Sequence, residues 1–345
     1  MPDGSVQYGF GIVGAGNIAD VHAEAIGALP NARVVAVHSR SLESATTLAN
    51  RFDARAHDTL DTFLAAPGLD IVCVCTPSGA HLEPAVAAAE AGKHVVVEKP
   101  LEITSKRSQQ IIAATQKAGV KLATIFNSRF ADAHVRLKRA LEAGELGTLL
   151  QGDTFVKWYR TQDYYDSGGW RGTWALDGGG ALMNQGVHQV DLLLWLMGPV
   201  AEVFAYAATL NHERVEVEDT LVATLRYESG ALGVLTAATS LYPGQPKTLE
   251  IHGTKGFVRV KDDEVDKWQV DDEEEEGGGE EKSVGTFSDP MALSFENHRR
   301  QLEDFLHALE EDATPLVDGQ AGLNAVELIE AIYRSADSGQ PVRLS

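Results

Sequence analysis

The 345-residue sequence has only two cysteines, no long apolar run and no excess of positive charge. Cys73 and Cys75 occupy alternate positions of an apolar strand, a spacing that disfavours a disulfide between them, so we interpret them as reduced core residues rather than a redox or zinc pair. No uncharged apolar stretch reaches the about 18 residues of a membrane span, and the N-terminus lacks the regions of a signal peptide. We therefore expect a cytoplasmic protein without a membrane partner.

The negative charge of the chain is concentrated in one segment. Of the formal net charge of -21, residues 262–281 carry -11, from twelve acids and one lysine, which leaves -10 for the rest of the chain. Self-repulsion and three consecutive glycines predict a mobile, solvated loop at about 262–282. A role in binding calcium or a cationic partner is the alternative, although the regular ligand spacing of a calcium loop is missing. The acidic balance argues against nucleic acid as a partner.

Several chemistries have no motif in this sequence. There is no Gly-x-Ser-x-Gly nucleophile elbow and no P-loop lysine. His22, His81 and His94 show no metal-ligand spacing among themselves, so we predict no metal site.

The length predicts about two domains, and the sequence changes its rhythm near residue 126. Before that point, short β-branched runs alternate with alanine-rich helical stretches, which is typical of a doubly wound parallel sheet. We predict an NAD(P)-binding Rossmann domain over residues 1–126. Its expected strands are Tyr8–Val13, Arg33–His38, Asp70–Cys75, His94–Glu98 and Val120–Phe126, and its expected helices are Ile18–Leu29, Leu42–Phe52, Leu82–Ala91 and Ser105–Ala118.

Residues 127–345 form the predicted second domain. Successive strands from Ala201 to Val260, with no helix between them, predict an antiparallel or mixed sheet. The other expected elements are a strand at Leu150–Trp158 and helices at Ala131–Ala143, Leu182–Met197, Phe295–Glu311 and Gln320–Ser338. The last helix, at about 320–338, is one that we expect could pack back on the Rossmann domain.

A glycine turn follows the first predicted strand. In Gly14-x-Gly16-x-x-Ala19, the first glycine permits a tight turn and the second lets the backbone approach a pyrophosphate. Backbone N–H groups at the start of the next helix, at Asn17 and Ile18, would then hold that anion. The alternative is a turn that only packs a helix on a strand, but the strand-turn-helix context favours cofactor binding.

Ser39 and Arg40 follow the second strand, at the place where an acid would bind the ribose hydroxyls of NAD. Without an acid, a 2′-phosphate is not repelled, and a hydroxyl and a guanidinium are available to it. We favour NADP slightly over NAD, with adenine stacking or solvent exposure as the alternatives for Arg40.

Four segments together resemble the Gfo/Idh/MocA family of glucose-fructose oxidoreductase and inositol dehydrogenase relatives. They are the glycine turn, the string Thr76-Pro77-Ser78-Gly79-Ala80-His81, the string from Gly92 to Glu98-Lys99-Pro100, and Gly178-Gly179-Gly180 with Asn184 and His188. The resemblance covers almost the whole chain. It implies a Rossmann domain joined to an α/β domain with a large open, mostly antiparallel sheet used for oligomer contacts, and hence a homodimer or homotetramer. It also implies hydride transfer between nicotinamide and a ring carbon of a sugar, cyclitol or related polyol.

The resemblance gives the site residues chemical roles. His188 is able to move a proton near neutral pH, and Lys99 to polarise the reacting oxygen, with Glu98 positioning the lysine. Inositol dehydrogenase relatives have aspartate where this chain has Asn184, and an amide only orients a substrate or ring by hydrogen bonds. Asp191, one turn after His188, is a further candidate to orient the imidazole, or a structural helix residue.

The segment 157–174 is basic and aromatic. The string Trp170-Arg171-Gly172-Thr173-Trp174 looks most like relatives that act on nucleotide-linked sugars, including UDP-N-acetylglucosaminuronate dehydrogenases. By this resemblance, Trp170 and Arg171 contact the cofactor, as do Thr76, Pro77 and His81, while Arg129 is a further candidate near it. Arg160 and Tyr164 suit a carbohydrate with a carboxylate or phosphate, unless Tyr164 only packs the loop and Arg160 faces water. A sensing regulator without turnover is the alternative function, favoured by Asn184.

Overall fold

The computed structural model describes residues 7–271, 273–277 and 294–344, which divide into two compact units. The first unit comprises the described residues up to Asn127 together with those from 294 to Leu323. The second unit comprises Ser128 to the acidic segment and Asn324 onward. Each unit is described separately below.

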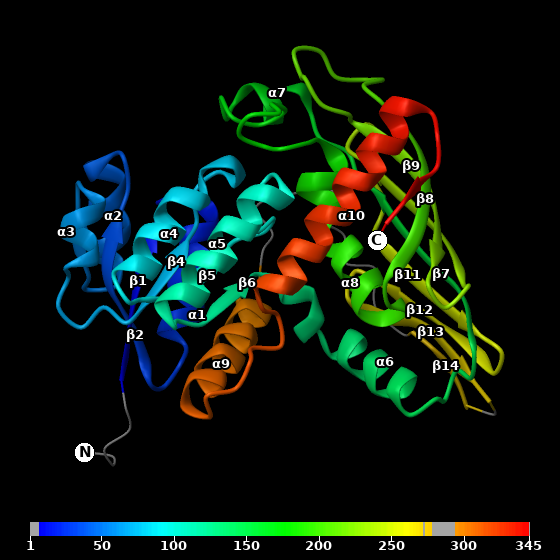
Figure 1. Ribbon diagram of the computed structural model, residues 1–345, viewed down its shortest axis with the longest axis horizontal. Coiled ribbons are helices and arrows are strands. Elements are labelled where there is room, and N and C mark those ends of the chain that lie inside the picture. Colours follow the sequence, from blue (N-terminus) through cyan, green and yellow to red (C-terminus); the bar gives the residue numbers. More distant parts are fainter. Residues whose placement is uncertain (1–6, 272, 278–293, 345) are drawn as a thin grey trace. The chain divides into compact units, whose positions relative to one another are not determined.

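The first unit is a six-stranded parallel sheet of order β3-β2-β1-β4-β5-β6, as predicted for a doubly wound domain. In Figure 1 its elements run from blue to cyan, apart from α9 in orange. The strands are β1 (Tyr8–Val13), β2 (Ala32–His38), β3 (Arg55–His57), β4 (Ile71–Val74), β5 (His94–Val97) and β6 (Leu122–Thr124). The helices are α1 (Asn17–Gly27), α2 (Leu42–Arg51), α3 (Leu60–Leu64), α4 (Leu82–Glu90), α5 (Ser105–Ala118) and α9 (Glu296–Glu310), with a 3₁₀ turn η1 (Ser78–Ala80). A second 3₁₀ turn, η2 (Asn127–Phe130), begins at Asn127 of this unit and continues in the second unit.

Two apolar clusters lie on the two faces of this sheet, because successive strand residues point to opposite sides. Ile12 and Cys73 pack with α1, α2 and α9, whereas Val13 and Val74 pack with α3, α4 and α5. The cysteines are buried free thiols within or next to β4.

Helix α9 belongs to the first unit and not, as we predicted, to the second domain. We assigned it to the second domain because it follows the strands of that domain in sequence. In the structure, Leu302, Phe305 and Leu306 form an apolar stripe that packs against the first sheet and α1. The predicted helix at 320–338 is α10 (Gly319–Ser338), whose residues up to Leu323 belong to the first unit and whose remainder belongs to the second.

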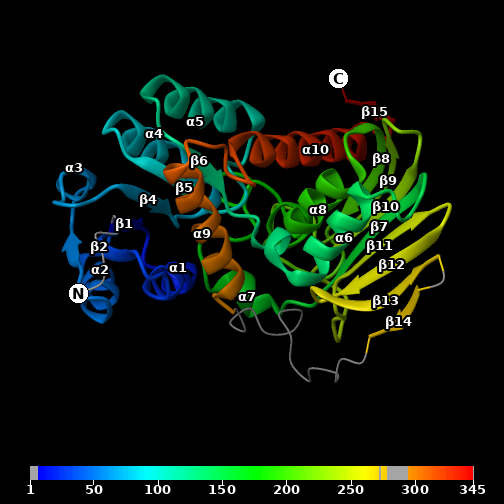
Figure 2. The same ribbon diagram turned by 90° about the horizontal axis from the view of Figure 1, so that it is seen from below.

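The second unit is built on a nine-stranded mixed sheet of order β14-β13-β12-β11-β7-β10-β9-β8-β15, in which β7 and β10 are parallel and the other pairs antiparallel. Figure 2 shows α6, α8 and most of α10 on one face of it. The strands are β7 (Leu149–Lys157), β8 (Val200–Ala208), β9 (Thr220–Tyr227), β10 (Leu232–Ala238), β11 (Thr248–Gly253), β12 (Gly256–Lys261), β13 (Glu264–Val270), β14 (Glu273–Glu276) and β15 (Val342–Arg343). The helices are α6 (Asp132–Glu142), α7 (Gln162–Asp166), the π-helix η3 (Ala181–Gly186), α8 (Val187–Met197) and α10.

The acidic segment corrects our loop prediction. Glu264–Val270 form β13 and Glu273–Glu276 form β14, which extend the sheet, while residues 272 and 278–282 lie outside the described residues. Trp268 on β13 is buried, and Arg136 of α6 lies over its ring with the guanidinium carbon 3.9 Å from the centroid. Cationic partners also neutralise some of the acids, since Arg259 pairs with Asp266 and Arg136 pairs with Glu275. Burial of an aromatic side chain therefore outweighs the charge repulsion on which the loop prediction rested.

Candidate active site

The glycine turn lies between β1 and α1, as predicted. Gly14 has a φ of 107°, and a Cβ atom there would lie 2.5 Å from the carbonyl oxygen of Cys75, so no larger residue fits without a shift. Gly16 is the exposed N-cap of α1, followed by the exposed Asn17 and the half-buried Ile18. The backbone N–H groups at the start of this helix suit an anion such as a pyrophosphate.

Ser39 and Arg40 follow β2, at the carboxyl end of the parallel sheet. Arg40 is exposed and Ser39 is partly exposed, whereas His38 is tied to the neighbouring strand by a 3.1 Å hydrogen bond between Nδ1 and the carbonyl oxygen of His57. A polar and cationic pair therefore stands where NAD-binding sheets of this class carry an acid.

The string that begins at Thr76 forms the loop after β4. His81 is buried, and its ring nitrogens lie 3.0 Å from the carbonyl oxygen of Thr76 and 2.9 Å from that of Pro100. Burial lowers the pKa of His81, against the effect of these carbonyl groups. The histidine thus joins the Thr76-Pro77 loop to the loop that follows β5, a role the sequence did not reveal.

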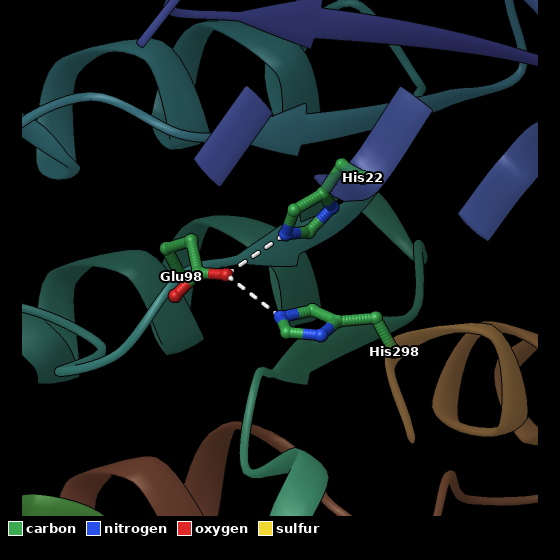
Figure 3. A group of neighbouring side chains, drawn as sticks. All are labelled: His22, Glu98 and His298. Atoms are coloured by element: carbon green, nitrogen blue, oxygen red, sulfur yellow. Dashed lines mark hydrogen bonds and ion pairs between the residues drawn. The ribbon is translucent and has the colours of Figure 1, made fainter. Parts of the chain in front are cut away.

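Lys99 and Glu98 follow β5 directly, as predicted. Lys99 is half-buried, whereas Glu98 is 5% exposed and lies between two histidines of the same unit, His22 of α1 and His298 of α9 (Figure 3). The Oε1 atom of Glu98 is 2.8 Å from His22 Nε2 and 3.5 Å from His298 Nε2. Its Oε2 atom accepts a 3.0 Å hydrogen bond from the backbone N–H of Lys99. The carboxylate therefore fixes the backbone from which the Lys99 side chain extends.

The protonation states within this cluster follow from its contacts. Burial acts to raise the pKa of Glu98, but the hydrogen bonds from His22 and His298 outweigh burial and hold that pKa well below its ordinary value. Burial acts to lower the pKa of His22, but the neighbouring Cys75 and Cys73 sulfurs and the Glu98 carboxylate raise it well above. Burial lowers the pKa of His298, whose Nδ1 atom is 3.1 Å from the side-chain nitrogen of Asn127. We interpret the arrangement as a charged His22–Glu98 pair with a neutral His298 that donates through Nε2.

The same three residues are the kind that bind metals, and their ligand atoms all lie within 4.8 Å of one another. The 2.8 Å between His22 Nε2 and Glu98 Oε1 is a hydrogen-bond distance. Two ligands of one tetrahedral zinc ion, each about 2.0–2.2 Å from the metal, would be about 3.3 Å apart. We interpret the cluster as hydrogen-bonded, and the absence of a metal site stays a prediction.

In the second unit, the start of the helix that carries Asn184 and His188 is held by Glu218. Its Oε2 atom accepts a 2.8 Å hydrogen bond from the backbone of Gly180, and its Oε1 atom accepts from the backbone of Leu182 at 2.9 Å and from the Tyr333 hydroxyl at 3.0 Å. Burial raises the pKa of Glu218 to about 7, against the effect of these donors. A Cβ atom at Gly180 would lie 1.7 Å from the Glu218 carbonyl oxygen, so the glycine is needed for this close approach.

Asn184 lies on the π-helix η3, and His188 lies on the first turn of α8; both side chains are half-buried. The Asn184 amide nitrogen donates a 2.7 Å hydrogen bond to Oδ1 of Asp177, a residue that we did not single out in the sequence. Both oxygens of Asp191 accept hydrogen bonds from Arg129, at 2.8 and 2.6 Å, which supports the structural alternative for this residue. Arg129, which we considered as a further candidate near the cofactor, is thus ion-paired with Asp191.

The structure brings together the predicted residues of the basic and aromatic segment. The guanidinium carbon of Arg171 is 4.6 Å from the Tyr164 ring centroid and 5.0 Å from that of Trp170, and Arg160 lies 5.7 Å from the Tyr164 ring. Gln185, next to Asn184, donates a 3.2 Å hydrogen bond to the Tyr164 hydroxyl. The aromatic segment thus contacts the helix that carries Asn184, while Tyr165 is buried against Thr239.

The fold and these motifs define the class of protein. A parallel sheet of this order with a glycine turn at the start of α1 is a dinucleotide-binding unit. Residues 8–126 match the oxidoreductase family with an NAD-binding Rossmann fold, and residues 134–259 match the GFO/IDH/MocA C-terminal domain. The chain belongs to the GFO/IDH/MocA family of oxidoreductases, as its sequence motifs indicated.

Two solved structures and one curated relative illustrate the similarity. The chain is 34% identical to the WlbA dehydrogenase from Bordetella pertussis in complex with NADH and UDP-GlcNAcA, with a TM-score of 0.86 and coverage of 98% of this chain and 99% of that one. It is 34% identical to the Chromobacterium violaceum WlbA dehydrogenase in complex with the same two ligands, with a TM-score of 0.87 and coverage of 100% and 98%. It is 28% identical to myo-inositol 2-dehydrogenase of Thermotoga maritima, covering 97% of this chain and 98% of the relative. Among the helices described here, none is long and apolar enough to cross a membrane.

Three residues of these hydrogen-bond networks were not predicted from the sequence as partners of the site residues. In the sequence, His22 was considered only as a metal ligand, and His298 and Asp177 were not considered. His22 had one usable signal, since it lies on the predicted helix that follows the glycine turn. His298 had none, because 200 residues separate it from Glu98 in the sequence.

Proposed function

We propose that this oxidoreductase transfers a hydride between nicotinamide and a secondary alcohol or ketone carbon of a sugar, sugar acid, cyclitol or nucleotide sugar. In the oxidation direction, the hydroxyl proton goes to His188, the hydride leaves the ring carbon for C4 of the nicotinamide, and a ketone forms. Lys99 stabilises negative charge on the reacting oxygen, and Asn184 orients the substrate. The observation that carries this proposal is the half-buried His188 on a helix whose start Glu218 and Asp177 hold.

We infer that a nucleotide-linked uronate is the best single candidate substrate. The two WlbA dehydrogenases at 34% identity are bound to UDP-GlcNAcA. In this chain, the partly exposed Arg171 lies over Tyr164 beside the helix of Asn184, so a cationic group is available to an anionic sugar, whereas Arg160, which also lies over that ring, is 5% exposed. On the family resemblance of their segment, we also propose that Trp170 and Arg171 contribute to the cofactor site.

For the cofactor, the family establishes NAD binding and our proposal extends it to NADP. Gly14, Gly16, Asn17 and Ile18 hold the pyrophosphate, while the loops of Thr76, Pro77 and His81 line the nicotinamide side. Arg40 is exposed just after the end of β2 and is preceded by Ser39 and followed by Ser41, which supports acceptance of a 2′-phosphate.

We also propose a cytoplasmic homodimer or homotetramer that assembles through the nine-stranded sheet. Tyr206 and Val222 are paired on neighbouring strands and are 65% and 44% exposed, and Leu232 on the next strand is 55% exposed. Such apolar exposure on the sheet supports an interface. Multi-angle light scattering of the wild type and of Tyr206→Lys tests it, because a monomeric wild type removes the proposal.

The test of the activity is the absorbance of reduced nicotinamide when the purified protein, with NAD or NADP, meets UDP-GlcNAcA, free uronates, sugars and inositols. Lys99→Ala and His188→Ala should each reduce turnover by about two to four orders of magnitude. Unchanged turnover in both variants would remove the mechanism. Cofactor binding without turnover across the panel would instead favour the sensing regulator, for which the amide of Asn184 is the supporting feature.

A further inference from the structure

The Asn184 amide is held by a carboxylate that is itself fixed in place. Asp177 is 2% exposed, and its Oδ1 atom accepts the 2.7 Å hydrogen bond from Asn184 Nδ2. Its Oδ2 atom accepts a 2.9 Å hydrogen bond from the backbone N–H of Gly172. The backbone N–H of Asp177 donates in turn to the carbonyl oxygen of Thr173 at 3.0 Å. The carboxylate therefore has little freedom to turn away from the helix of Asn184.

The chemistry of this pair determines which way the amide faces. An ionised carboxylate accepts hydrogen bonds and donates none, and N–H donors on both of its oxygens favour the ionised form. Asn184 can therefore meet Asp177 only through its NH2 group. The carbonyl oxygen Oδ1 is then the other arm of the planar amide, on the helix turn that precedes His188.

We propose that Asp177 is a positioning residue that orients the Asn184 amide so that its carbonyl oxygen accepts a hydrogen bond from a hydroxyl group of the sugar. The inference rests on the proposed function for its substrate. It places the negative charge one hydrogen bond behind the position where the inositol dehydrogenase relatives carry an aspartate. Position 184 is thereby a neutral acceptor, which does not repel an anionic sugar as a carboxylate would.

A double-mutant cycle separates orientation from simple packing. The variants are Asp177→Asn, Asn184→Asp and the exchange Asp177→Asn/Asn184→Asp, all in the full-length protein. Asp163→Asn, which removes an exposed acid of α7, is the matched control. The melting temperature of each protein is measured without substrate across a pH series. Separate samples are assayed for turnover of UDP-GlcNAcA, and the binding of UDP-GlcNAcA is measured by calorimetry in the presence of NADH.

Each variant has a distinct expected result. Asn184→Asp brings two carboxylates into hydrogen-bond contact, where they must share a proton, so its melting temperature should lie below that of the wild type at about pH 8 and approach it at about pH 5. The exchange restores one amide and one carboxylate and should recover most of the lost melting temperature at both pH values. Asp177→Asn keeps a hydrogen bond but lets the amide face either way, so we expect a small change in melting temperature and a loss in kcat of about tenfold or more.

Turnover of the exchange decides the acceptor role. If the anionic sugar needs a neutral acceptor at position 184, the exchange, which carries a carboxylate there, remains at least about tenfold slower than the wild type although its fold has recovered. Full recovery of its turnover would overturn the neutral-acceptor argument. Unchanged turnover of Asp177→Asn, or strictly additive melting temperatures across the cycle, would overturn the orientation argument. A wild type that neither binds nor turns over the sugar overturns the proposed function. The melting temperatures of the double-mutant cycle then still decide whether Asp177 orients the Asn184 amide.

Discussion

Replacement of Glu98 by Gln is the sharpest test of the buried cluster in Figure 3. Glutamine keeps the shape of the side chain but carries one acceptor oxygen where the carboxylate carries two. Its NH2 group must then face either the backbone N–H of Lys99 or the histidine N–H groups. In either position an N–H donor faces another donor and loses its hydrogen bond. An unsatisfied buried donor costs about 1–3 kcal/mol, and the lost charge-assisted bond from His22 about 1.5–3 kcal/mol.

These two losses together predict that the Glu98→Gln protein is about 3–5 kcal/mol less stable than the wild type, the range found when one partner of a buried ion pair is removed. At about 2–4 °C per kcal/mol for a unit of this size, the melting temperature should fall by about 10 °C. Calorimetry of the full-length protein measures this shift. Glu90→Gln, at the exposed end of α4, is the matched control and should leave the melting temperature unchanged.

The pH dependence gives this prediction its sign. The pKa of Glu98 is lowered from 4.5 on folding, so its stabilisation is present above pH 4.5 and is lost as the pH falls through the lower folded value. The pKa of His22 is raised from 6.5, so its stabilisation is complete below pH 6.5 and is lost as the pH rises through the higher folded value. The difference between wild type and Glu98→Gln should therefore be largest between pH 4.5 and 6.5. A difference that is constant with pH, or close to zero throughout, would refute the charged-pair interpretation.

Three further predictions follow from the site. Arg40→Ala should weaken NADPH binding by about tenfold or more and leave NADH binding nearly unchanged, as measured by cofactor fluorescence; equal losses for both cofactors would argue against a contact with the 2′-phosphate. The pKa of Glu218 rises from 4.5 to about 7 on folding, so the folded state binds a proton that the unfolded state releases in this range. As the pH rises from 4.5 to about 7, the free energy of unfolding of the wild type should therefore fall by up to about 3 kcal/mol relative to that of Glu218→Gln. Melting temperatures of the two proteins that change in parallel with pH would contradict this prediction. Zinc or EDTA should leave the wild-type melting temperature within about 1 °C if the histidine–glutamate cluster is hydrogen-bonded, whereas a zinc-dependent rise that disappears in His298→Ala would show a metal site.

The periodic parts of the chain were predictable because their signals are local. Strand β1 and helix α5 have the predicted bounds, since β-branched alternation and the Thr104 cap with Gly119 at the other end mark them within a few residues. The short elements β3, α3 and α7 were missed because none is longer than five residues, too short to show a period. The glycine turn and the Glu98-Lys99 pair were also local and lay where predicted.

Contacts between distant segments could not be predicted in the same way. The acidic segment shows the clearest failure. Its charge run suggested a solvated loop, but the buried Trp268 and the cations of α6 and β12 stabilise strands at Glu264–Val270 and Glu273–Glu276. Glu98, His22 and His298 come together only because α1 and α9 pack on the same face of the first sheet. The Asp177–Asn184 hydrogen bond depends on a turn with several positive-φ glycines, whose path the sequence alone does not determine.

The position of α9 has a consequence for how this protein is made. Since the first unit consists of residues up to Asn127 and a second stretch that ends at Leu323, a ribosome must synthesise the intervening strands before that unit is complete. At about 5–20 residues per second, the apolar surface of α1 and its sheet waits on the order of ten to thirty seconds for Leu302, Phe305 and Leu306. A truncated gene that stops after residue 127 should therefore yield an aggregation-prone fragment, and addition of a peptide spanning α9 should return it to solution.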